Sequence, residues 1–412
     1  MAPEIVGITE AELPELHRVC CTAFGEDTNE EMVADERLVC EYDRMLGVSD
    51  NGQLVGSAGA YSFRLTVPGL ASVGAAGVTW VSVLPTHRRR GILRDLMEYQ
   101  LDDIADREEP VALLTASEAT IYGRFGYGVG AQHVKASVRT NRAAFVDDID
   151  DPGTIRLAWS GDKEAVATMA EIYDEWRRAR PGALDRHEGW WGVVLNDHAH
   201  HRRGLGKSIY AIHEDADGSP DGYASYNVKL GDGEGSNTVV VDEVIALDPV
   251  ADGALWRFLL DIDLTKKVVA NALALDDPLK WRLADPRALT AEYVEDWLWV
   301  RILDAPAALE ARAYPATGRL VIEIDDPFRP DGRAAGTFVL DADPEGATCE
   351  RADGHEPDLT IPVDALGTIW LGGARPSTLA DAGRINAFDE DTLALADAMF
   401  AVTPLPFCNH AF

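Results

Sequence analysis

Segments with the composition of β-strands alternate with amphipathic helical segments in the first third of the chain, and this alternation constrains the fold most strongly. The stretches "QLVGSAGAYSFRLTV" (53–67) and "GVTWVSVLP" (77–85) are rich in β-branched and aromatic residues, as strands are. From Ile92 to Ala105 apolar residues recur at three- and four-residue steps, which predicts a helix with one buried face. The apolar run 111–117 then predicts a short buried strand. Such a pattern folds into an α/β sheet.

Two further helices are expected before these strands, at 9–25 and 29–42, and the pattern then restarts twice along the chain. The acidic, turn-rich stretch "FVDDIDDPGT" (145–154) predicts a linker between the first region and the second. The second region contains helical segments at 162–180 and 251–264 and strand segments at 207–215, 222–230 and 237–250. The third begins near Trp297, with strand segments at 319–326, 336–343 and 359–373 and then helices to about Ala401. Three domains are therefore expected in the 412 residues, at 1–144, 145–295 and 296–412.

The chain is strongly acidic, with 70 Asp and Glu against 37 Lys and Arg and a formal net charge of −33. This balance argues against a nucleic-acid partner, whose binding depends mainly on basic contacts to phosphate. It favours small cationic substrates through long-range steering. An acidic surface that serves solubility alone is an equally good interpretation.

Cysteine and histidine usage indicates neither a disulfide framework nor a metal site. The five cysteines show no CxxC and no metal-type spacing, which suggests reduced thiols in a cytoplasm. The tract "DHAHH" (197–201) is more typical of a surface loop than of a zinc site. The first residues lack a signal-peptide pattern, and no apolar run reaches the roughly 18 residues of a membrane span. A cytoplasmic protein without a metal or a membrane partner is expected.

Three consecutive arginines, Arg88 to Arg90, precede a glycine where the helix from Ile92 should begin. The helix macrodipole disfavours a cation in the first turn by roughly 0.3–1 kcal/mol at an exposed site. A bound anion would reverse the sign, because free N–H groups at a helix start point toward it and Gly91 allows its close approach. Arginine side chains also bind phosphate oxygens, often bidentately. The stretch predicts either a phosphate-binding loop or a solvated basic surface.

This strand–loop–helix unit resembles the pyrophosphate-binding element of the GNAT acyltransferase superfamily. The pattern Arg/Gln-x-x-Gly-x-Gly/Ala is matched by Arg88 and Gly91 and departs at Leu93, where a small residue is usual. Superfamily members often carry a tyrosine shortly before a glycine–aromatic pair, on the helix after the next strand. The stretch "IYGRFGYG" supplies Tyr122 there, with Tyr127 as a competitor for the role. The alternative for Tyr122 is a core aromatic packed on the sheet.

Several longer strings resemble the enhanced-intracellular-survival (Eis) family of acetyltransferases in actinobacteria. They are "RLTVPG", "PTHRRRG", "ASEATIYGRFGYG", "WLWVRILDAPAALEAR" and "GRINAFDEDTLALADAMFA". The resemblance implies an α/β (α+β) fold with two tandem GNAT-like domains of mixed sheets and a sterol-carrier-protein-like C-terminal α+β domain. It also implies an acetyl-CoA-dependent N-acetyltransferase for aminoglycoside or polyamine-like amines, which works by direct transfer in a ternary complex and assembles as a homo-hexamer. Only the first domain should bind CoA, and the second region indeed lacks an arginine–glycine stretch after its last long strand.

The resemblance also assigns roles to individual residues. The carboxylate of Phe412, in a C-terminus that reaches the active site, would accept a proton from the acceptor, and Tyr122 would protonate the departing thiolate. Backbone N–H groups around Val81 would stabilise the developing oxyanion. The expected cofactor-binding residues are Val81, Val83, Arg88, Arg89, Gly91, Ile92 and Ser117. Local acids, represented by Glu26 and Glu36, could receive a polycationic acceptor, although solvated helix positions are the commoner fate of such residues.

Two other functions remain open from the sequence. The chain could be a non-catalytic CoA- or lipid-binding protein, which the departure at Leu93 and the residue Ala411 before the terminal phenylalanine would favour. The presence of Tyr122 and Phe412 counts against this reading. A protein-lysine or longer-chain acyltransferase is the alternative among enzymes, because pocket width and acyl-chain length cannot be derived from the residues.

Overall fold

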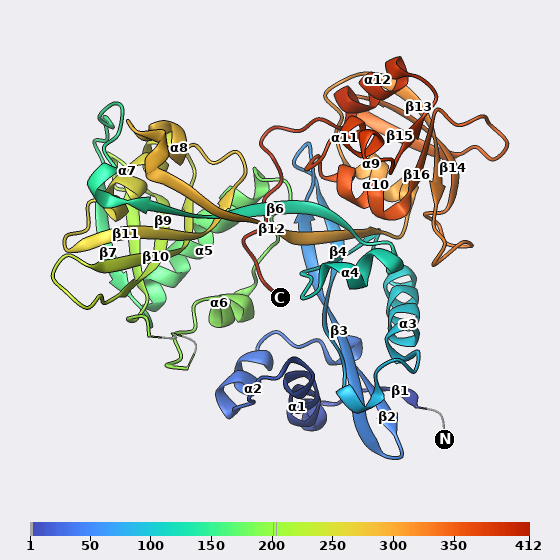
Figure 1. Cartoon of the computed structure of the whole chain (residues 1–412), viewed down its shortest axis with the longest axis horizontal. Helices are drawn as coiled ribbons and strands as arrows, with labels where there is room; N and C mark the ends of the chain where they lie inside the picture. The colour runs from blue at the N-terminus through green and yellow to red at the C-terminus, as the bar shows by residue number, and fades with distance from the viewer. Residues whose placement is uncertain (1–2, 201, 203) are drawn as a thin grey trace. The chain divides into compact units, whose positions relative to one another are not determined.

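The computed structural model describes residues 3–200, 202 and 204–412 (Figure 1). The chain divides into two compact units. Unit 1 contains the residues up to Ala131 together with Asp296–Pro406 and His410–Phe412, and unit 2 contains Gln132–Glu295 together with Phe407–Asn409. Among the described residues, no helix combines the length and apolarity needed to cross a membrane. The expected domain boundaries at 1–144, 145–295 and 296–412 stay a prediction.

The N-terminal part of unit 1 is a mixed α/β sheet with the strand order β1-β2-β3-β4-β5-β12. Strands β1 to β4 pair antiparallel, β5 runs parallel to β4, and β12 runs antiparallel to β5. Helix α3 provides the crossover that a parallel pair requires. The elements that lie wholly within this part are β1 (Glu4–Gly7), α1 (Leu13–Phe24), α2 (Glu30–Glu36), β2 (Leu46–Asp50), β3 (Gln53–Thr66), β4 (Ser72–Val83), α3 (Ile92–Asp106), β5 (Val111–Leu114) and α4 (Ala119–Tyr122).

Helices α1 and α3 pack against β3 and β4. The predicted apolar face of α3 is confirmed, because it buries Ile92, Leu96, Met97, Leu101 and Ile104. The helix predicted over 29–42 is too long, since α2 ends at Glu36 and a turn follows it. The apolar residues beyond that point, at 38–40, are consecutive and do not continue a helical spacing.

The C-terminal part of unit 1 has its own five-stranded sheet, in the order β15-β14-β13-β16-β17. Its elements are α9 (Ala305–Ala311), β13 (Gly318–Asp325), β14 (Gly336–Asp343), β15 (Gly346–Arg351), β16 (Leu359–Pro362), α10 (Val363–Trp370), α11 (Pro376–Asp381), β17 (Asn386–Ala387) and α12 (Glu390–Phe400). The strand predicted over 359–373 is wrong beyond Pro362, where α10 begins. Helix α10 is buried on most sides, and a short, almost wholly apolar run cannot be told from a buried strand by its periodicity.

Unit 2 contains most of β6 and the first half of β12, and its strand order is β6-β11-β10-β9-β8-β7. Buried apolar residues of α7 pack with β9, β10 and β11, and those of α5 with β8, β9 and β10. The elements are β7 (Thr154–Trp159), α5 (Lys163–Arg178), α6 (Glu188–Val194), β8 (Ile209–Glu214), β9 (Pro220–Lys229), β10 (Asn237–Ala246), α7 (Pro249–Leu260), β11 (Thr265–Ala274) and α8 (Leu279–Arg282).

Three long strands were not expected from the sequence. They are β6 (Gly128–Arg139), β11 (Thr265–Ala274) and β12 (Leu289–Ile302). The boundaries between the units fall inside β6 and β12. Their sequences mix glycine, alanine, lysine and acidic residues with apolar ones, and β-propensity is weak for these residue types. Pairing with neighbouring strands, rather than local preference, therefore determines these elements.

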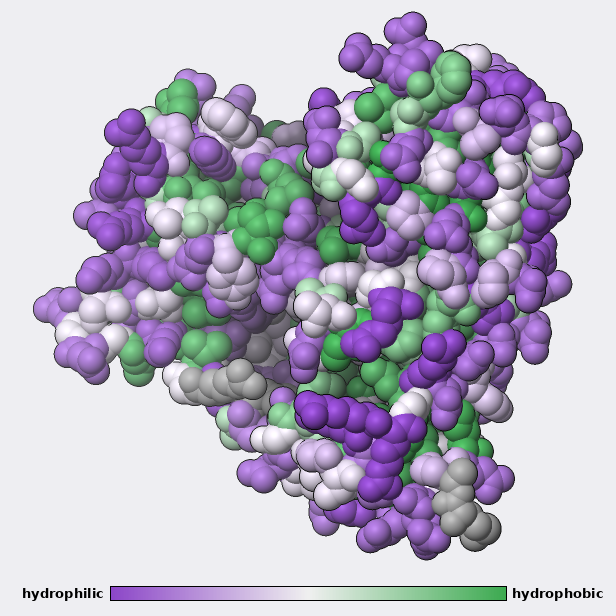
Figure 2. Space-filling model, turned by 45° about the vertical axis from the view of Figure 1, so that its right-hand side comes forward, coloured by the Kyte–Doolittle hydropathy of each residue, from purple (hydrophilic) through white to green (hydrophobic). Residues whose placement is uncertain are grey.

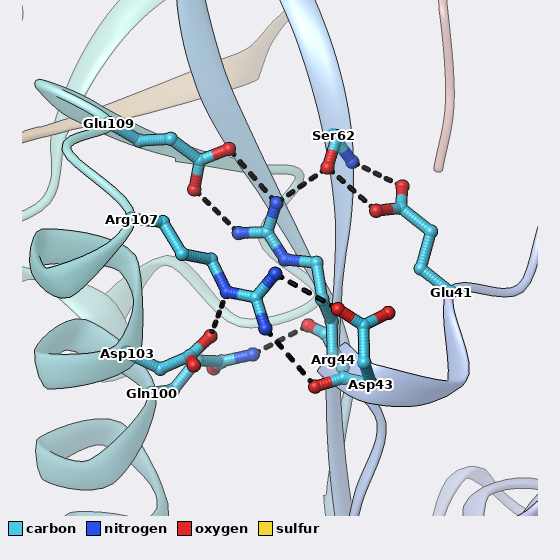
Figure 3. A network of polar contacts seen from close by, with 9 residues as sticks. Glu41, Asp43, Arg44, Ser62, Gln100, Asp103, Arg107 and Glu109 are labelled. Carbon is cyan, nitrogen blue, oxygen red and sulfur yellow. Dashed lines mark hydrogen bonds and ion pairs between the residues drawn. The ribbon is translucent and has the colours of Figure 1, made fainter.

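A buried arginine, Arg44, joins the loop after α2 to β3 and to the end of α3 (Figure 3). Its guanidinium donates to both carboxylate oxygens of Glu109, at 2.9 and 2.6 Å, and to Oγ of Ser62 at 2.7 Å. The hydroxyl and the backbone N–H of Ser62 both donate to Glu41, each at 2.6 Å. These contacts hold β3 beside the segment that leads from α3 into β5.

Candidate active site

The arginine loop contains two residues with a positive φ just before α3. Strand β4 ends at Val83, and α3 begins at Ile92 after Gly91, whose φ is +90°. Arg89 has a φ of +64°, which is uncommon for a residue with a side chain. No described side chain caps the first turn of α3, and a Cβ at Gly91 would meet no atom within 4 Å. The first N–H groups of α3 thus adjoin open space at the positive end of the helix dipole.

The three arginines of the loop have different surroundings. Arg88 donates to the carbonyl of Ala23 at 3.0 Å and so ties the loop to the end of α1. Nη1 of Arg90 lies 3.8 Å from a carboxylate oxygen of Asp50, which Nε2 of His87 approaches to 3.2 Å. Arg89 is exposed and makes no hydrogen bond or ion pair with another described residue. Asp50 therefore balances part of the positive charge, and Arg89 is the guanidinium available to a ligand.

A cavity of about 300 Å³ lies between α1, α2, β4 and α4 in unit 1. Its lining includes six of the residues expected at the site: Glu26, Glu36, Val81, Ser117, Tyr122 and Phe412. The other lining residues are His17, Cys20, Cys21, Phe24, Met32, Val78, Thr79, Trp80 and Thr115. The remaining expected residues do not line it and belong to the end of β4 and to the arginine loop: Val83, Arg88, Arg89, Gly91 and Ile92. The expected residues thus divide between a cavity beside the second half of β4 and the loop that follows the end of this strand.

Strand β4 carries a β-bulge at the cavity wall. Ser57 pairs with Ser82 and Gly59 pairs with Thr79, so one residue of β3 faces two residues of β4. The extra residue is Trp80, with a φ of +58°. A bulge leaves backbone groups unpaired in the ladder, and bulges are frequent beside active sites. Sequence reasoning missed this feature, because a tryptophan gives no signal for a positive φ.

The two candidate tyrosines occupy different environments. Tyr122 ends α4 and lines the cavity, and burial raises the pKa of its hydroxyl to about 12. Tyr127 is fully buried and is not part of the cavity lining. Its hydroxyl finds no hydrogen-bond partner among the described residues. Of the two phenols, Tyr122 is placed to reach a ligand in the cavity and remains protonated at neutral pH.

Aromatic contacts hold Phe412 at the cavity. Its ring lies 5.0 Å from the ring of Phe63, centroid to centroid. A Cβ at Gly77 would lie 3.0 Å from the Phe412 ring, so the glycine permits this approach. Two residues earlier, the carbonyl of His410 accepts a hydrogen bond of 3.2 Å from Nε1 of Trp297. These contacts fix a segment that would otherwise be expected to fray.

The cavity contains a carboxylate with an unusual environment, Glu36. Oε2 of Glu36 accepts a hydrogen bond of 3.0 Å from the hydroxyl of Tyr61, which in turn accepts one of 2.9 Å from Nε1 of Trp80. Burial raises the pKa of Glu36 to about 7, the Tyr61 hydrogen bond opposes this rise, and Asp35 adds to it. The sequence indicated an acid at this position but gave no sign of Tyr61 or Trp80.

Thiol and imidazole groups in the cavity are in their neutral forms. Burial raises the pKa of Cys20 to about 12 and also raises that of Cys21. The pKa of His17 is lowered by its burial. Cys20 is therefore a poor nucleophile at neutral pH, because the thiolate is the reactive form.

Replacement of Glu36 by glutamine should make stability less dependent on pH. The pKa of Glu36 rises on folding from an ordinary 4.5 to about 7, so its contribution is most favourable below pH 4.5 and is lost as the pH rises through 7. Glutamine still accepts from Tyr61 but carries no charge. At pH 8 the variant should be more stable by up to about 3 kcal/mol, and near pH 4.5 it should equal the wild type. Urea unfolding at both pH values measures the difference.

The matched control is Glu26→Gln, which removes a charge from an exposed side chain of the same cavity. We expect nearly equal urea midpoints for this variant and the wild type at both pH values. A stability gain at pH 8 in both variants would mean that general charge repulsion, rather than the burial of Glu36, is responsible.

The described residues of the tract at 197–201 are Asp197, His198, Ala199 and His200. The rings of His198 and His200 stack with centroids 5.5 Å apart, and His201 lies outside the described residues. Within the described part of the chain, no three His, Cys, Asp or Glu side chains are grouped to hold a metal ion.

Comparisons with known proteins agree with this geometry. Residues 4–130 and 182–302 each match an Acetyltransferase (GNAT) domain, and residues 305–409 match a Sterol carrier protein domain. An uncharacterized N-acetyltransferase of Streptomyces avermitilis is 41% identical over 377 residues, which cover 90% of each chain. N-acetyltransferase Eis of Mycobacterium tuberculosis is 33% identical over 404 residues, 95% of each chain. The crystal structure of Eis1 from Mycobacterium abscessus superposes with a TM-score of 0.87 at 34% identity, covering 99% of this chain and all of that one.

The resemblance suggested by the arginine loop and the long sequence strings is therefore confirmed, and so is the expected fold of two GNAT domains with a sterol-carrier-like C-terminal part. The chain belongs to the Eis-type N-acetyltransferases of the GNAT superfamily.

Proposed function

We propose that this N-acetyltransferase transfers the acetyl group of acetyl-CoA directly to an amine of a cationic acceptor of the polyamine or aminoglycoside type. The observation that carries the acceptor class is the charge of the cavity in unit 1. Its described lining contains the acids Glu26 and Glu36 and no lysine or arginine. The carboxylates of these acids would attract an ammonium group and repel an anion.

The donor site follows from the arginine loop. Arg88, Arg89 and the first N–H groups of α3, next to Gly91 and Ile92, would hold the pyrophosphate. Val81 and Val83 would hold the pantetheine through their backbone groups, and Ser117 would lie along its path. When bound, acetyl-CoA supplies an activated acetyl group. The register of β3 and β4 shifts at Trp80, and a bulge leaves backbone groups outside the ladder, which supports an oxyanion site in this part of β4.

Proton transfer is assigned to groups at the cavity. Tyr122 keeps its proton at neutral pH and would donate it to the leaving sulfur. The carboxylate of Phe412 is the base that the family resemblance suggests. A covalent acyl-cysteine route is disfavoured, because burial keeps Cys20 and Cys21 as thiols. Direct attack by the amine is therefore the simpler proposal.

The net charge of the whole chain is weaker evidence for a cationic acceptor than the acids of the cavity. Hydrophilic side chains cover most of the face in Figure 2, with apolar ones scattered among them. An acidic surface that serves solubility remains the alternative meaning of the net charge of −33. The cavity acids, rather than the whole-chain charge, are therefore the basis of the proposed acceptor class. A cytoplasmic location and a homo-hexamer complete the proposal, and analytical ultracentrifugation of the purified chain tests the assembly.

The test of the function is CoA thiol release from acetyl-CoA with a linear polyamine or an aminoglycoside, together with the mass of the product. One or more acetyl groups on the acceptor would support the proposal. Acetyl-CoA binding without thiol release on any amine would instead favour the non-catalytic binding protein. Release with a lysine peptide but not with either small amine would favour the protein-lysine acyltransferase.

Loss of the loop arginines should weaken acetyl-CoA binding. Each charge-assisted hydrogen bond to phosphate contributes about 1.5–3 kcal/mol, so Arg89→Ala should raise Kd about tenfold or more. The double variant with Arg88→Ala should weaken binding further, because Arg88 also ties the loop to the carbonyl of Ala23. Isothermal titration calorimetry with acetyl-CoA measures both effects.

Arg90→Ala provides the control for this experiment, since Arg90 already faces Asp50 and the carbonyl of Thr86. It removes the same charge from the same loop and should leave Kd within about threefold. Unchanged affinity in the double variant would exclude the loop as the pyrophosphate site.

A further inference from the structure

Glu36 is a half-buried carboxylate that lines the cavity, and no described lysine or arginine pairs with it. It is the last residue of α2 and lines the cavity together with Val81 and Tyr122. Among the described residues, Tyr61 is the one hydrogen-bond donor to its side chain, and no lysine or arginine forms an ion pair with it. The Tyr61 bond holds Oε2 and leaves Oε1 available to a ligand. An unpaired carboxylate in such a place is costly unless a ligand cation or a proton neutralises it.

Its hydrogen-bond donor is itself held rigidly. Tyr61 is 2% exposed on β3, and its hydroxyl accepts a hydrogen bond from the indole of Trp80, the bulge residue of β4. The chain Trp80–Tyr61–Glu36 therefore links the backbone feature proposed to bind the thioester oxygen with the carboxylate. A base held by a fixed donor keeps one position in the cavity. Proton transfer by a positioned group requires this.

The basicity of Glu36 suits proton transfer near neutral pH. Burial raises its pKa from an ordinary 4.5 to about 7. Brønsted behaviour favours a base whose pKa is close to the working pH. Ionised Glu36 is therefore suited to remove a proton from a group in the cavity near pH 7.

Burial shifts the pKa values of the imidazole, thiols and phenols around Glu36 in the direction that favours their neutral forms. Burial lowers the pKa of His17 on α1 and raises the pKa values of Cys20, Cys21 and Cys40. Burial also raises the pKa values of Tyr61 on β3 and Tyr122 on α4. The neighbouring charge of Asp35 raises the pKa of Glu36 further. Glu26 and the terminal residue Phe412 also line the cavity. Glu36 differs from the imidazole, thiols and phenols because burial brings its pKa to about 7.

We propose that Glu36 is the general base of the acetyl transfer and removes a proton from the acceptor's ammonium group. This inference rests on the acetyl transfer proposed above. The nitrogen, now neutral, forms a bond to the thioester carbon as the carbon–sulfur bond breaks. Tyr122 gives its proton to the sulfur and regains one from the nitrogen, while the proton on Glu36 passes to solvent. One ammonium and one thioester thus yield one amide, one thiol and one proton.

The test is the pH profile of kcat/KM for a linear polyamine in the wild type and in Glu36→Gln. With Glu36 as base, the wild type should show an acid limb near pH 7 and a plateau up to the amine pKa of about 10. In Glu36→Gln only the fraction of the polyamine whose amine is already neutral in solution can react. Its kcat/KM should be at least 100-fold lower at pH 7 and should rise about tenfold per pH unit to pH 10, with no plateau.

Two companion measurements separate catalysis from folding and from charge. An arylamine acceptor, which is uncharged at pH 7, needs no initial deprotonation, so Glu36→Gln should acetylate it within about threefold of the wild-type rate. Glu26→Gln removes a carboxylate from the same cavity and should raise KM while keeping the acid limb. Tyr61→Phe removes the donor that lowers the pKa of Glu36, so its acid limb should move to higher pH.

The failures of the two proposals are distinguishable. A wild type that acetylates the polyamine, with an acid limb that survives unchanged in Glu36→Gln, would overturn the role of Glu36 and leave the acetyl transfer standing. Loss of that limb on removal of Phe412 alone would assign the base to the terminal carboxylate. A wild type that is inert with both acceptors would overturn the acetyl transfer itself and, with it, the role of Glu36.

Discussion

Replacement of Tyr122 by phenylalanine should lower kcat by a factor of about 10² to 10⁴, the range that a positioned acid contributes. The substitution removes one oxygen from the cavity wall and keeps the ring that packs in the core around α3. Because the hydroxyl would act on the leaving sulfur only as the bond breaks, KM for acetyl-CoA and for the amine should change little. Steady-state thiol release at saturating concentrations of both substrates measures the effect.

The dependence of kcat on pH above neutrality offers a second check on Tyr122. Burial raises the pKa of its hydroxyl to about 12, so the acid form persists through the accessible pH range. We expect no fall in kcat between pH 8 and 10 that can be attributed to this residue. A fall in that range that disappears in Tyr122→Phe would mean that the hydroxyl is more acidic than its surroundings indicate.

Tyr127→Phe is the matched control. The Tyr127 hydroxyl is buried without a hydrogen-bond partner among the described residues, so its removal should leave turnover unchanged and stability equal or slightly higher. If Tyr127→Phe abolishes turnover and Tyr122→Phe does not, the acid has been assigned to the wrong tyrosine.

Replacement of Arg44 by alanine should destabilise unit 1 by about 3 kcal/mol. Arg44 is 3% exposed and bonds both oxygens of Glu109, whose side chain is 13% exposed. Truncation leaves this carboxylate largely buried without its cation and removes a donor to Ser62. Hydrogen exchange of the β3 amides and the urea midpoint should both show the loss, because the guanidinium joins β3 to the end of α3 (Figure 3).

The neighbouring Arg107 provides the comparison. It pairs with Asp43 at 3.0 Å and with Asp103 at 2.9 Å, and its side chain is 33% exposed. Partly exposed ion pairs contribute about 0–1 kcal/mol, so Arg107→Ala should cost no more than that. An equal loss of stability in Arg44→Ala and Arg107→Ala would show that the contribution of these ion pairs does not depend on their burial.

The arginine loop and the helix after it could be predicted from the sequence because their signals are local. Ile92, Leu96 and Leu101 carry the helical period within one stretch, and Gly91 directly precedes them. The tyrosine on α4 was found for the same reason, since its motif spans only a few residues. The choice between Tyr122 and Tyr127 could not be made locally, because it depends on which ring the surrounding elements enclose.

Other parts of the candidate site depend on residues far apart in the chain. Asp50, which faces both His87 and Arg90, comes from β2 and is invisible in the loop sequence. Two parts of the fold were missed for the same reason. They are strand β12, which was not expected, and helix α10, which lies in the stretch 359–373 that was predicted as one strand. An apolar or mixed segment adopts strand or helix according to its neighbours, so local pattern could not decide either element.

The sequence by itself determined the family, the mixed α/β plan of the first region and the place of the arginine loop before a helix, because periodicity and short motifs lie in contiguous residues. Only the tertiary structure decided that Trp80 bulges from β4, that Tyr61 donates to Glu36, and that the cavity lining has acids without a lysine or arginine among its described residues. Burial and distance set the pKa of a carboxylate, and both arise only when β3, β4 and α2 have packed together.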